Sequence, residues 1–358
     1  MGSIIYEVNQ HQMDTTRVRF VLDKGTGIYK KVVTNRPITE ATLQSYRTIA
    51  ANYIKYCRAH HTVHITDKRG RVRDRACRRV AECQPYIQDY IDYLVAQGKS
   101  PSTIHTYAAG LCHFYGKPLA EYILPKRHTA DYTRGRGAKA SSARRDAQPE
   151  VSPRLAALAA AVGCRRAEYA GLRGDDLITD ESGHLCVRIK HGKGNKYQLQ
   201  RILPQHVDLV KSYFDGTSDY VFSQKEMSNK LNLHGRRAAL AWEAYQYYAH
   251  RLAAEPKYRE QLRLELQARI KAANQRNIEA AKVKSKRWDG TRWDEREFSG
   301  VYYLRGKNRA LAQRLGRPLS YDKAALLAVS ILHLSHYRSD VTVASYILAQ
   351  NSTDRKDA

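Results

Sequence analysis

The sequence contains no long run of apolar residues. Its longest apolar stretch, Ala324–Leu334, is interrupted by Ser330 and His333, whereas a membrane-spanning helix needs roughly 20 apolar residues. The first residues, Met1–Gln12, lack a basic segment followed by an apolar core, so we expect no secretory signal peptide. Tyr6 stands where N-myristoylation requires Ser or Thr. These absences predict a cytoplasmic protein without a membrane anchor.

Acidic residues are scarce relative to basic ones. The 358 residues include 35 Asp and Glu against 61 Lys and Arg, a formal net charge of +26. Such a charge opposes compaction through self-repulsion, so we expect it to serve a polyanionic partner. Nucleic acid is the leading candidate, because neutralising phosphates releases condensed counterions. The hydrophobic share of 42% indicates a globular protein, and the length is typical of two or three domains.

Cysteine pairs with metal-ligand spacing are also absent. The six cysteines are scattered without a C-x-x-C pair, which argues against a zinc site and favours reduced, buried thiols. The sequence shows no cluster of carboxylates of the kind that a two-metal site requires. Asp175 and Asp176 are adjacent in sequence and therefore do not face one another on a helix. We expect no metal and no cofactor.

The order of patterns along the chain predicts four segments. Residues 1–36 contain a β-hairpin at 17–33, interpreted either as an extra DNA-binding arm or as a flap. Residues 37–124 have helical periodicity, with a basic loop at 68–73. Residues 125–150 form a basic, glycine-rich linker, and residues 151–358 form a second domain with a helical insertion at about 228–290. The predicted fold class is mainly α with small β-sheets (α+β).

Two motifs open the second domain. An apolar helix stops at Gly163, and Arg165 stands at the start of the next helix, where backbone N–H groups favour an anion. Glu168 follows one turn later and can orient the Arg165 guanidinium. Further on, Lys193 lies at the tip of a glycine turn between two expected strands, Leu185–Ile189 and Gln198–Leu203, with Lys196 beside it. Taken alone, each motif is more often an ordinary feature of a solvated surface.

Three further motifs lie near the C-terminus. Tyr302 and Arg305 share the stretch Val301–Arg309, and His336 ends the segment Leu334-Ser335-His336. Tyr346 then falls within Val341–Leu348, which has the composition of a short amphipathic helix.

In this order, the motifs resemble those of the tyrosine recombinase (phage-type integrase) family of mobile elements. The stretch Gly163–Leu172 looks like the first arginine motif of that family, and Gly192–Lys196 looks like its β-hairpin lysine. Tyr302-x-x-Arg305 stands where the family usually has His-x-x-Arg, so Tyr302 is a departure from the pattern. Leu334–His336 is similar to the Leu-Gly-His segment of the family, and Tyr346 falls where its nucleophile belongs. The resemblance covers roughly residues 40–350.

The resemblance implies a metal- and ATP-independent recombinase that cuts and rejoins DNA through a 3′-phosphotyrosine. Arg165, Arg305 and His336 would hold the phosphate, and Tyr346 would attack the phosphorus. Tyr302 would occupy the catalytic position that is usually a histidine in the family. Lys193 would protonate the leaving 5′-oxygen, with Lys196 as the alternative. The family context also implies a helical core-binding domain and a mixed α/β catalytic domain that clamp DNA in a C shape. It further implies a homotetramer on a double-stranded recombination site, a dimer per site, with accessory DNA-bending proteins as possible partners.

Alternatives stay open at this stage. Tyr337 is a rival nucleophile, because it directly follows His336. The same scaffold with an inactive site would be a sequence-specific DNA-binding regulator, and the same chemistry without strand exchange would be a type IB topoisomerase-like or hairpin-resolving enzyme. Seven basic residues are candidates for DNA contact: Arg69, Arg71, Arg73, Arg134, Arg136, Lys139 and Lys196.

Overall fold

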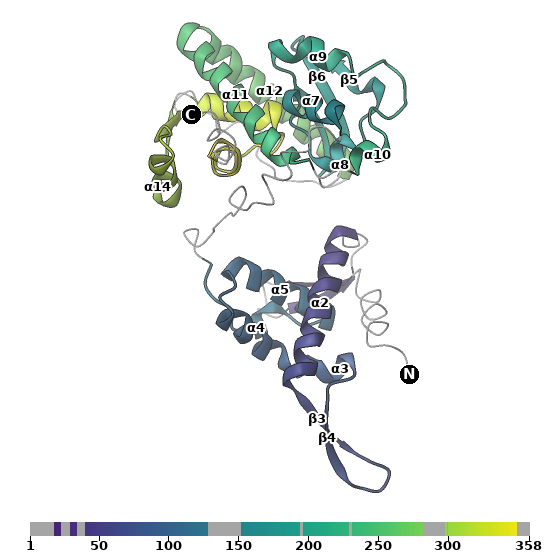
Figure 1. Ribbon diagram of the computed structural model, residues 1–358. Coiled ribbons are helices and arrows are strands. Elements are labelled where there is room, and N and C mark those ends of the chain that lie inside the picture. The colour runs from purple at the N-terminus through teal and green to yellow at the C-terminus, as the bar shows by residue number, and fades with distance from the viewer. Residues whose placement is uncertain are drawn as a thin grey trace. The chain divides into compact units, whose positions relative to one another are not determined.

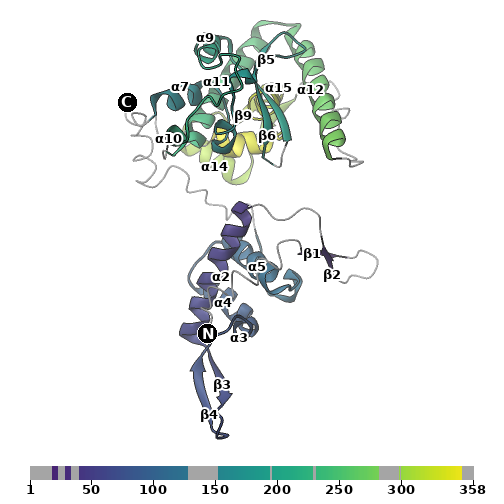
Figure 2. The same cartoon turned by 90° about the vertical axis from the view of Figure 1, so that its right-hand side faces the viewer.

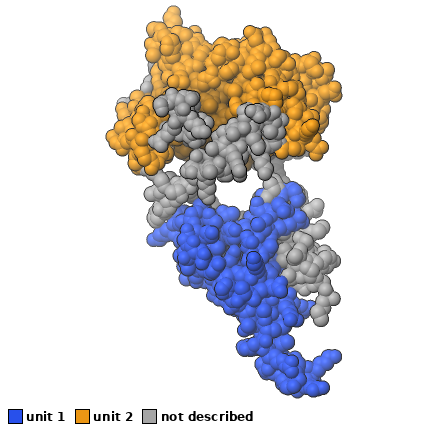
Figure 3. Space-filling view, in the orientation of Figure 1, with its two compact units in different colours: residues 1–133 blue, residues 134–358 orange. Residues whose placement is uncertain are grey.

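The chain divides into two compact units, Met1–Thr133 and Arg134–Ala358 (Figure 3). The computed structural model describes residues 18–22, 29–33, 40–127, 152–193, 196–228, 231–281, 298 and 300–348. Within these ranges the chain is mainly helical with small antiparallel sheets, which confirms the predicted α+β class. The basic linker expected at 125–150 lies almost wholly outside the described residues, as do Arg134, Arg136 and Lys139.

Unit 1 is a small helical domain (Figure 1) carrying two β-hairpins, which Figure 2 labels as β1–β2 and β3–β4. Its helices are α2 (Glu40–His60), α3 (Val80–Cys83), α4 (Ile87–Ala96) and α5 (Pro101–Tyr115), with 3₁₀ turns η1 (Gln84–Tyr86) and η2 (Leu119–Glu121). The predicted N-terminal hairpin is confirmed as β1 (Val18–Leu22) paired antiparallel with β2 (Tyr29–Val33). Helix α5 begins as its sequence indicates, because Ser100 Oγ accepts a hydrogen bond from the Thr103 N–H at 3.2 Å and Pro101 occupies the first turn. The helices bury one core, which includes Tyr53, Ile87, Ile91, Ile104, Leu111 and Phe114.

The second hairpin of unit 1 differs from the prediction of a basic loop. Strand β3 (Thr62–Thr66) pairs antiparallel with β4 (Val72–Ala76), so the predicted loop at 68–73 includes the hairpin tip and the start of a strand. In both Figure 1 and Figure 2 this hairpin extends beyond the helices of unit 1. Most of its residues are exposed, so no face of it shows the alternation of apolar and polar residues that identifies a half-buried strand.

Unit 2 places a three-stranded sheet beside a helical core. The sheet has the order β5 (Leu177–Thr179), β6 (Leu185–Gly192) and β7 (Lys196–Arg201), all antiparallel. The two predicted strands are confirmed as β6 and β7, and β5 is a further short strand that the pattern did not indicate. The first elements are α7 (Pro153–Ala161), capped by Ser152, then α8 (Arg166–Tyr169) and η5 (Gly174–Asp176). The segment after the sheet contains η6 (Pro204–His206), α9 (Val207–Lys211) and α10 (Gln224–Met227).

Helix α11 (Leu233–Ala254), within the segment 228–290 that was expected to be a helical insertion, packs into the core of unit 2. Its buried face, which includes Leu240, Ala244 and Tyr248, packs in one cluster with α15 (Lys323–Ala328) and η7 (Val329–His333). Helix α12 (Tyr258–Ala281) joins the same cluster through the apolar stripe that its sequence predicted, Leu262, Leu266 and Ile270.

The last part of unit 2 forms a smaller satellite and then the end of the described chain. Strands β8 (Val301–Tyr303) and β9 (Ser320–Asp322) pair antiparallel, and α14 (Gly306–Arg314) lies between them in the sequence. Helix α16 (Ser339–Thr342) leads directly into η8 (Val343–Ile347), which, like η7, is a π-helical turn. Such turns are rare and occur frequently at functional sites.

Candidate active site

Arg165 and Glu168 form a fixed pair at the start of α8. Arg165 is the N-cap residue, and its backbone N–H donates to Glu168 Oε2 at 2.7 Å. Its guanidinium Nη1 donates to Glu168 Oε1 at 2.6 Å. The Glu168 side chain is buried while that of Arg165 is partly exposed. Glu168 therefore holds the Arg165 side chain in one orientation, as the sequence spacing predicted.

A second arginine, Arg237 on α11, lies near the other oxygen of the same carboxylate. Its Nη1 lies 3.9 Å from Glu168 Oε2 and donates to the carbonyl of Gly163, and its Nη2 donates to the carbonyl of Leu334 at 2.5 Å. The side chain is 2% exposed. Gly163 is required beside it, because a Cβ at that position would lie 2.9 Å from the His333 carbonyl oxygen. One buried carboxylate thus lies between two guanidinium groups.

Tyr346 lies against Arg237 and two imidazole rings. The Arg237 guanidinium carbon is 5.5 Å from the centre of the Tyr346 ring, within the range of a cation–π contact. The His336 ring stacks on Tyr346, with 5.5 Å between centroids and 21° between planes, and the His234 ring lies 5.1 Å away. Tyr346 is 7% exposed and sits in the π-helical turn η8. We call Arg165, Glu168, Arg237, His336 and Tyr346 the Tyr346 cluster.

His336 is held by a strained loop between η7 and α16. Its backbone N–H donates to the Ser330 carbonyl at 3.1 Å, and its Nδ1 lies 3.3 Å from Ser330 Oγ. Its two neighbours, Ser335 and Tyr337, have φ of 50° and 55°, a left-handed conformation that non-glycine residues rarely adopt. Strain of this kind persists only where the surroundings impose it, and it gathers at functional sites.

The charges that act on His336 are mainly positive, and the Asp340 carboxylate opposes them only in part. Burial, and then the positive charges of Arg237 and Arg165, lower the pKa of His336 to about 3, so the ring is neutral at pH 7. Its Nε2 is buried and meets no hydrogen-bond partner within the described residues. A neutral ring with an unused nitrogen beside two guanidiniums and one carboxylate is a site with spare positive charge and spare hydrogen-bonding capacity, which a phosphate would fit.

The structure does not place Arg305 in the Tyr346 cluster. Arg305 is the exposed N-cap of α14, and Tyr302 is half-buried in the satellite core with Leu304 and Tyr321. Burial raises the pKa of the Tyr302 phenol. Among the described contacts of the Tyr346 ring, the guanidinium is that of Arg237, which stands 68 residues before Arg305 in the chain.

Sequence reasoning missed Arg237 and His234, although a signal for both is present. The stretch His234-Gly235-Arg236-Arg237 has the His-x-x-Arg spacing that was assigned to Tyr302-x-x-Arg305. It was missed because 228–290 was interpreted as an insertion. The side chains of both residues approach Tyr346 because they are three positions apart on one helix and so share a face.

The two lysines of the glycine turn lie where strands β6 and β7 are joined, and both are exposed. Lys193 is exposed at the tip of the β6–β7 hairpin, and Lys196 is exposed at the start of β7. Gly194 and Asn195, between them, lie outside the described residues. The neighbouring strand residues pair with carboxylates instead, since Lys190 lies 3.2 Å from Asp175 and 3.1 Å from Asp176.

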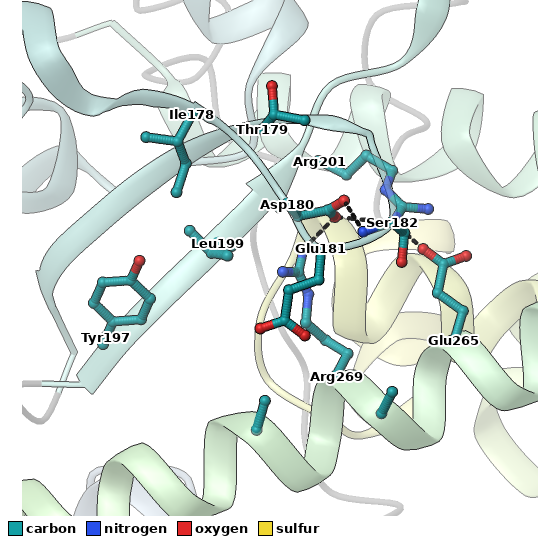
Figure 4. Close-up of a pocket in the computed structure, with 12 residues that line it drawn as sticks. Ile178, Thr179, Asp180, Glu181, Ser182, Tyr197, Leu199, Arg201, Glu265 and Arg269 are labelled. Carbon is teal, nitrogen blue, oxygen red and sulfur yellow. Dashed lines mark hydrogen bonds and ion pairs between the residues drawn. The ribbon is translucent and has the colours of Figure 1, made fainter.

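A second group of charged side chains lies between β7 and α12 (Figure 4). Arg201 pairs with Asp180 at 3.1 Å and with Glu265, and Arg269 lies 3.4 Å from Asp180. His184 is within 3.8 Å of both carboxylates. Asp180, His184 and Glu265 have the spacing of three metal ligands, but both carboxylates already pair with guanidinium groups. We call these five residues the Asp180 cluster and interpret it as a structural ion network.

Comparisons with known proteins find matches among solved structures, and the match described here is of low similarity. No family model and no curated protein matches the chain. A solved structure described as the crystal structure of XerA recombinase is similar at 14% identity, covering 67% of this chain and 83% of that chain with a TM-score of 0.21. At that TM-score, any assignment of activity rests on the geometry of the Tyr346 cluster. Among the described helices, none has the length and apolarity to span a bilayer.

Proposed function

We propose that this chain is a site-specific DNA recombinase that cuts and rejoins strands through a 3′-phosphotyrosine at Tyr346. One observation carries the proposal: a late tyrosine lies against a buried guanidinium and a neutral imidazole, in a site with unbalanced positive charge. A phosphodiester supplies the missing negative charge, and the phenol oxygen supplies a nucleophile. The formal net charge of +26 supports a DNA substrate.

In this proposal the two guanidiniums bind the non-bridging oxygens of the scissile phosphate. Arg165 and Arg237 remain protonated and present planar sets of donors, which match the charge that develops in the transition state. Glu168 touches both side chains and positions them. Arg237 replaces Arg305 in this role, and His336 contributes one further hydrogen bond.

The chemical step exchanges one phosphorus–oxygen bond for another. The Tyr346 hydroxyl gives up its proton to solvent as its oxygen attacks phosphorus, the bond to the 5′-oxygen breaks, and the departing oxygen takes a proton from Lys193, with Lys196 as the alternative acid. The phosphotyrosine conserves the energy of the broken bond, so religation by a 5′-hydroxyl requires no ATP. Tetramer assembly, a C-shaped clamp of the two units, and accessory DNA-bending proteins belong to the same proposal.

The test is formation of a covalent adduct on DNA. The substrate is a nicked duplex whose sequence comes from the inverted repeats flanking the gene, and the adduct is detected on a denaturing gel. Tyr346→Phe should bind the duplex but form no adduct, because it lacks the attacking oxygen. Tyr337→Phe is the matched control and should form the adduct. An adduct that survives in Tyr346→Phe would reject the assignment of the nucleophile.

A further inference from the structure

The tip of the β3–β4 hairpin has a built conformation. The Asp67 N–H donates to the Arg71 carbonyl, and the Gly70 N–H donates to the Asp67 carbonyl, both at 2.9 Å. Gly70 has φ of 75°, the left-handed conformation that closes a three-residue hairpin loop. The Asp67 carboxylate also accepts from the backbone N–H groups of Arg69 at 2.8 Å and Arg71 at 3.0 Å. These bonds fix the corner positions, Lys68 and Arg69, at the outermost point of the hairpin.

The cations of this tip differ in how far they are already engaged. Arg71 and Arg73 share the Asp67 carboxylate, with Nε distances of 3.0 and 3.8 Å. Lys68 and Arg69 are exposed, and their side chains form no ion pair with any residue that the structure describes. At the tip, Lys68 and Arg69 are therefore available to bind an anion, whereas Arg71 and Arg73 are partly neutralised by Asp67.

The hairpin has no core of its own to stabilise it. Val63 packs against unit 1 at its base, but Ile65 is 36% exposed and Val72 67% exposed. A two-stranded hairpin in water is marginally stable at best. An extension that stands clear of the helices and gains little from burial is explained most simply by a partner that it contacts.

The residue types of the hairpin favour a duplex. From Thr62 to Ala76 the chain has five Lys and Arg residues against two Asp, a net charge of +3. The same segment contains no Phe, Tyr or Trp, whereas proteins that hold single strands stack bases on aromatic side chains. A two-stranded ribbon also fits the major groove of B-form DNA.

We infer that the β3–β4 hairpin is a DNA-binding ribbon whose tip contacts duplex phosphates through Lys68 and Arg69. The inference rests on the proposed function, because it assumes that the chain works on DNA. It adds a specific prediction to the sequence-based candidates Arg69, Arg71 and Arg73: the two corner residues, which have no carboxylate partner, contribute more to binding than the two that share Asp67.

The experiment measures binding of the full chain to a fluorescein-labelled 40-bp duplex of mixed sequence, by anisotropy over a range of salt concentrations. Lys68→Ala/Arg69→Ala should weaken binding roughly 10- to 60-fold at 0.1 M salt and reduce the slope of log K against log salt by about 1.8, since each phosphate contact contributes about 0.9. Lys55→Ala/Lys99→Ala removes the same charge from exposed positions of unit 1 and should change the slope little. The double exchange Lys68→Arg/Arg69→Lys keeps both charges and should bind the duplex with the affinity of the wild-type chain.

A second variant tests the shape of the tip without removing charge. Gly70→Val disfavours the positive φ and should weaken binding in the same direction. Equal losses from the hairpin and control pairs would overturn the inference, as would preferential binding of the hairpin to a single strand or to an acidic protein. Wild-type protein is assayed in parallel for adduct on the nicked duplex. If wild type forms no adduct but the Lys68/Arg69 substitutions still weaken binding, the recombinase proposal is rejected and the DNA-binding hairpin is retained. If wild type forms the adduct but the substitutions do not weaken binding, the hairpin inference is rejected and the recombinase proposal is retained.

Discussion

The Tyr346 cluster and the Asp180 cluster use the same residue types to different ends. Each contains two arginines, and each has one guanidinium that is almost fully buried, Arg237 in the first and Arg201 in the second. The Asp180 cluster sets two carboxylates against its two guanidiniums, while the Tyr346 cluster has the single carboxylate of Glu168 for both. The first arrangement is neutral apart from His184, and the second keeps an uncompensated positive charge.

The difference shows how a structural ion network can be told from a binding site. A buried charge is tolerated when partners and hydrogen bonds compensate its lost hydration. Arg201 meets this condition, and although burial alone would lower its pKa, the hydrogen bond to Glu265 raises it. The Tyr346 cluster stays unbalanced until an anion arrives, which is the property expected of a phosphate site.

Breaking the balanced cluster should cause the largest loss of stability. Arg201→Met leaves Asp180 and Glu265 without their shared partner, so the free energy of unfolding should fall by about 3–5 kcal/mol. Urea denaturation measures it. Arg263→Met, which breaks the more exposed pair with Glu260 on α12, is the matched control and should cost less than about 1 kcal/mol. Equal losses from the two variants would show that the Asp180 cluster is not a stabilising network.

Replacing the planar guanidinium of Arg237 should have the next largest effect. Arg237→Lys keeps the charge but loses the planar pair of donors, so the rate of adduct formation should fall about 100- to 1000-fold, near 3 kcal/mol. Arg305→Lys is the control and should alter the rate less than about threefold, because that side chain is an exposed N-cap. A larger effect at Arg305 than at Arg237 would restore the sequence-based assignment. Unfolding measurements on both variants separate lost catalysis from lost stability.

The sequence predicted those features that depend on local pattern. The caps at Ser100 and Ser152, the pairing of Arg165 with Glu168, and the stripe along α12 follow from residues a few positions apart. The choice between Arg237 and Arg305 could not be made that way, because it depends on which of two arginines the tertiary fold buries against Tyr346. The β3–β4 hairpin was missed for a different reason: without a buried face, its strands show no period-two hydrophobic pattern.

The pH dependence of stability gives a smaller effect, which depends on two buried histidines, His333 and His336. Burial lowers the pKa values of His333 and His336 to about 3, with added repulsion from Arg201 at the first and from Arg237 and Arg165 at the second. In the unfolded chain a histidine titrates near 6.5, so between pH 6.5 and 3 the unfolded state binds the extra protons. Stability is therefore fully present above about pH 6.5 and is lost as the pH falls toward 3.

Between pH 7 and pH 5 each histidine should account for a loss of about 2 kcal/mol, somewhat less for the partly exposed His336. Urea denaturation at the two pH values measures the loss in wild type, in His333→Gln and in His336→Gln, and each variant should recover its own share. A duplex bound at the Tyr346 cluster brings a phosphate next to His336 and raises its pKa, so DNA should reduce the share of His336 and leave that of His333, which hydrogen-bonds Tyr248, unchanged. If DNA changed the loss of unfolding free energy from His333 and from His336 equally, the DNA phosphate would not bind at the Tyr346 cluster.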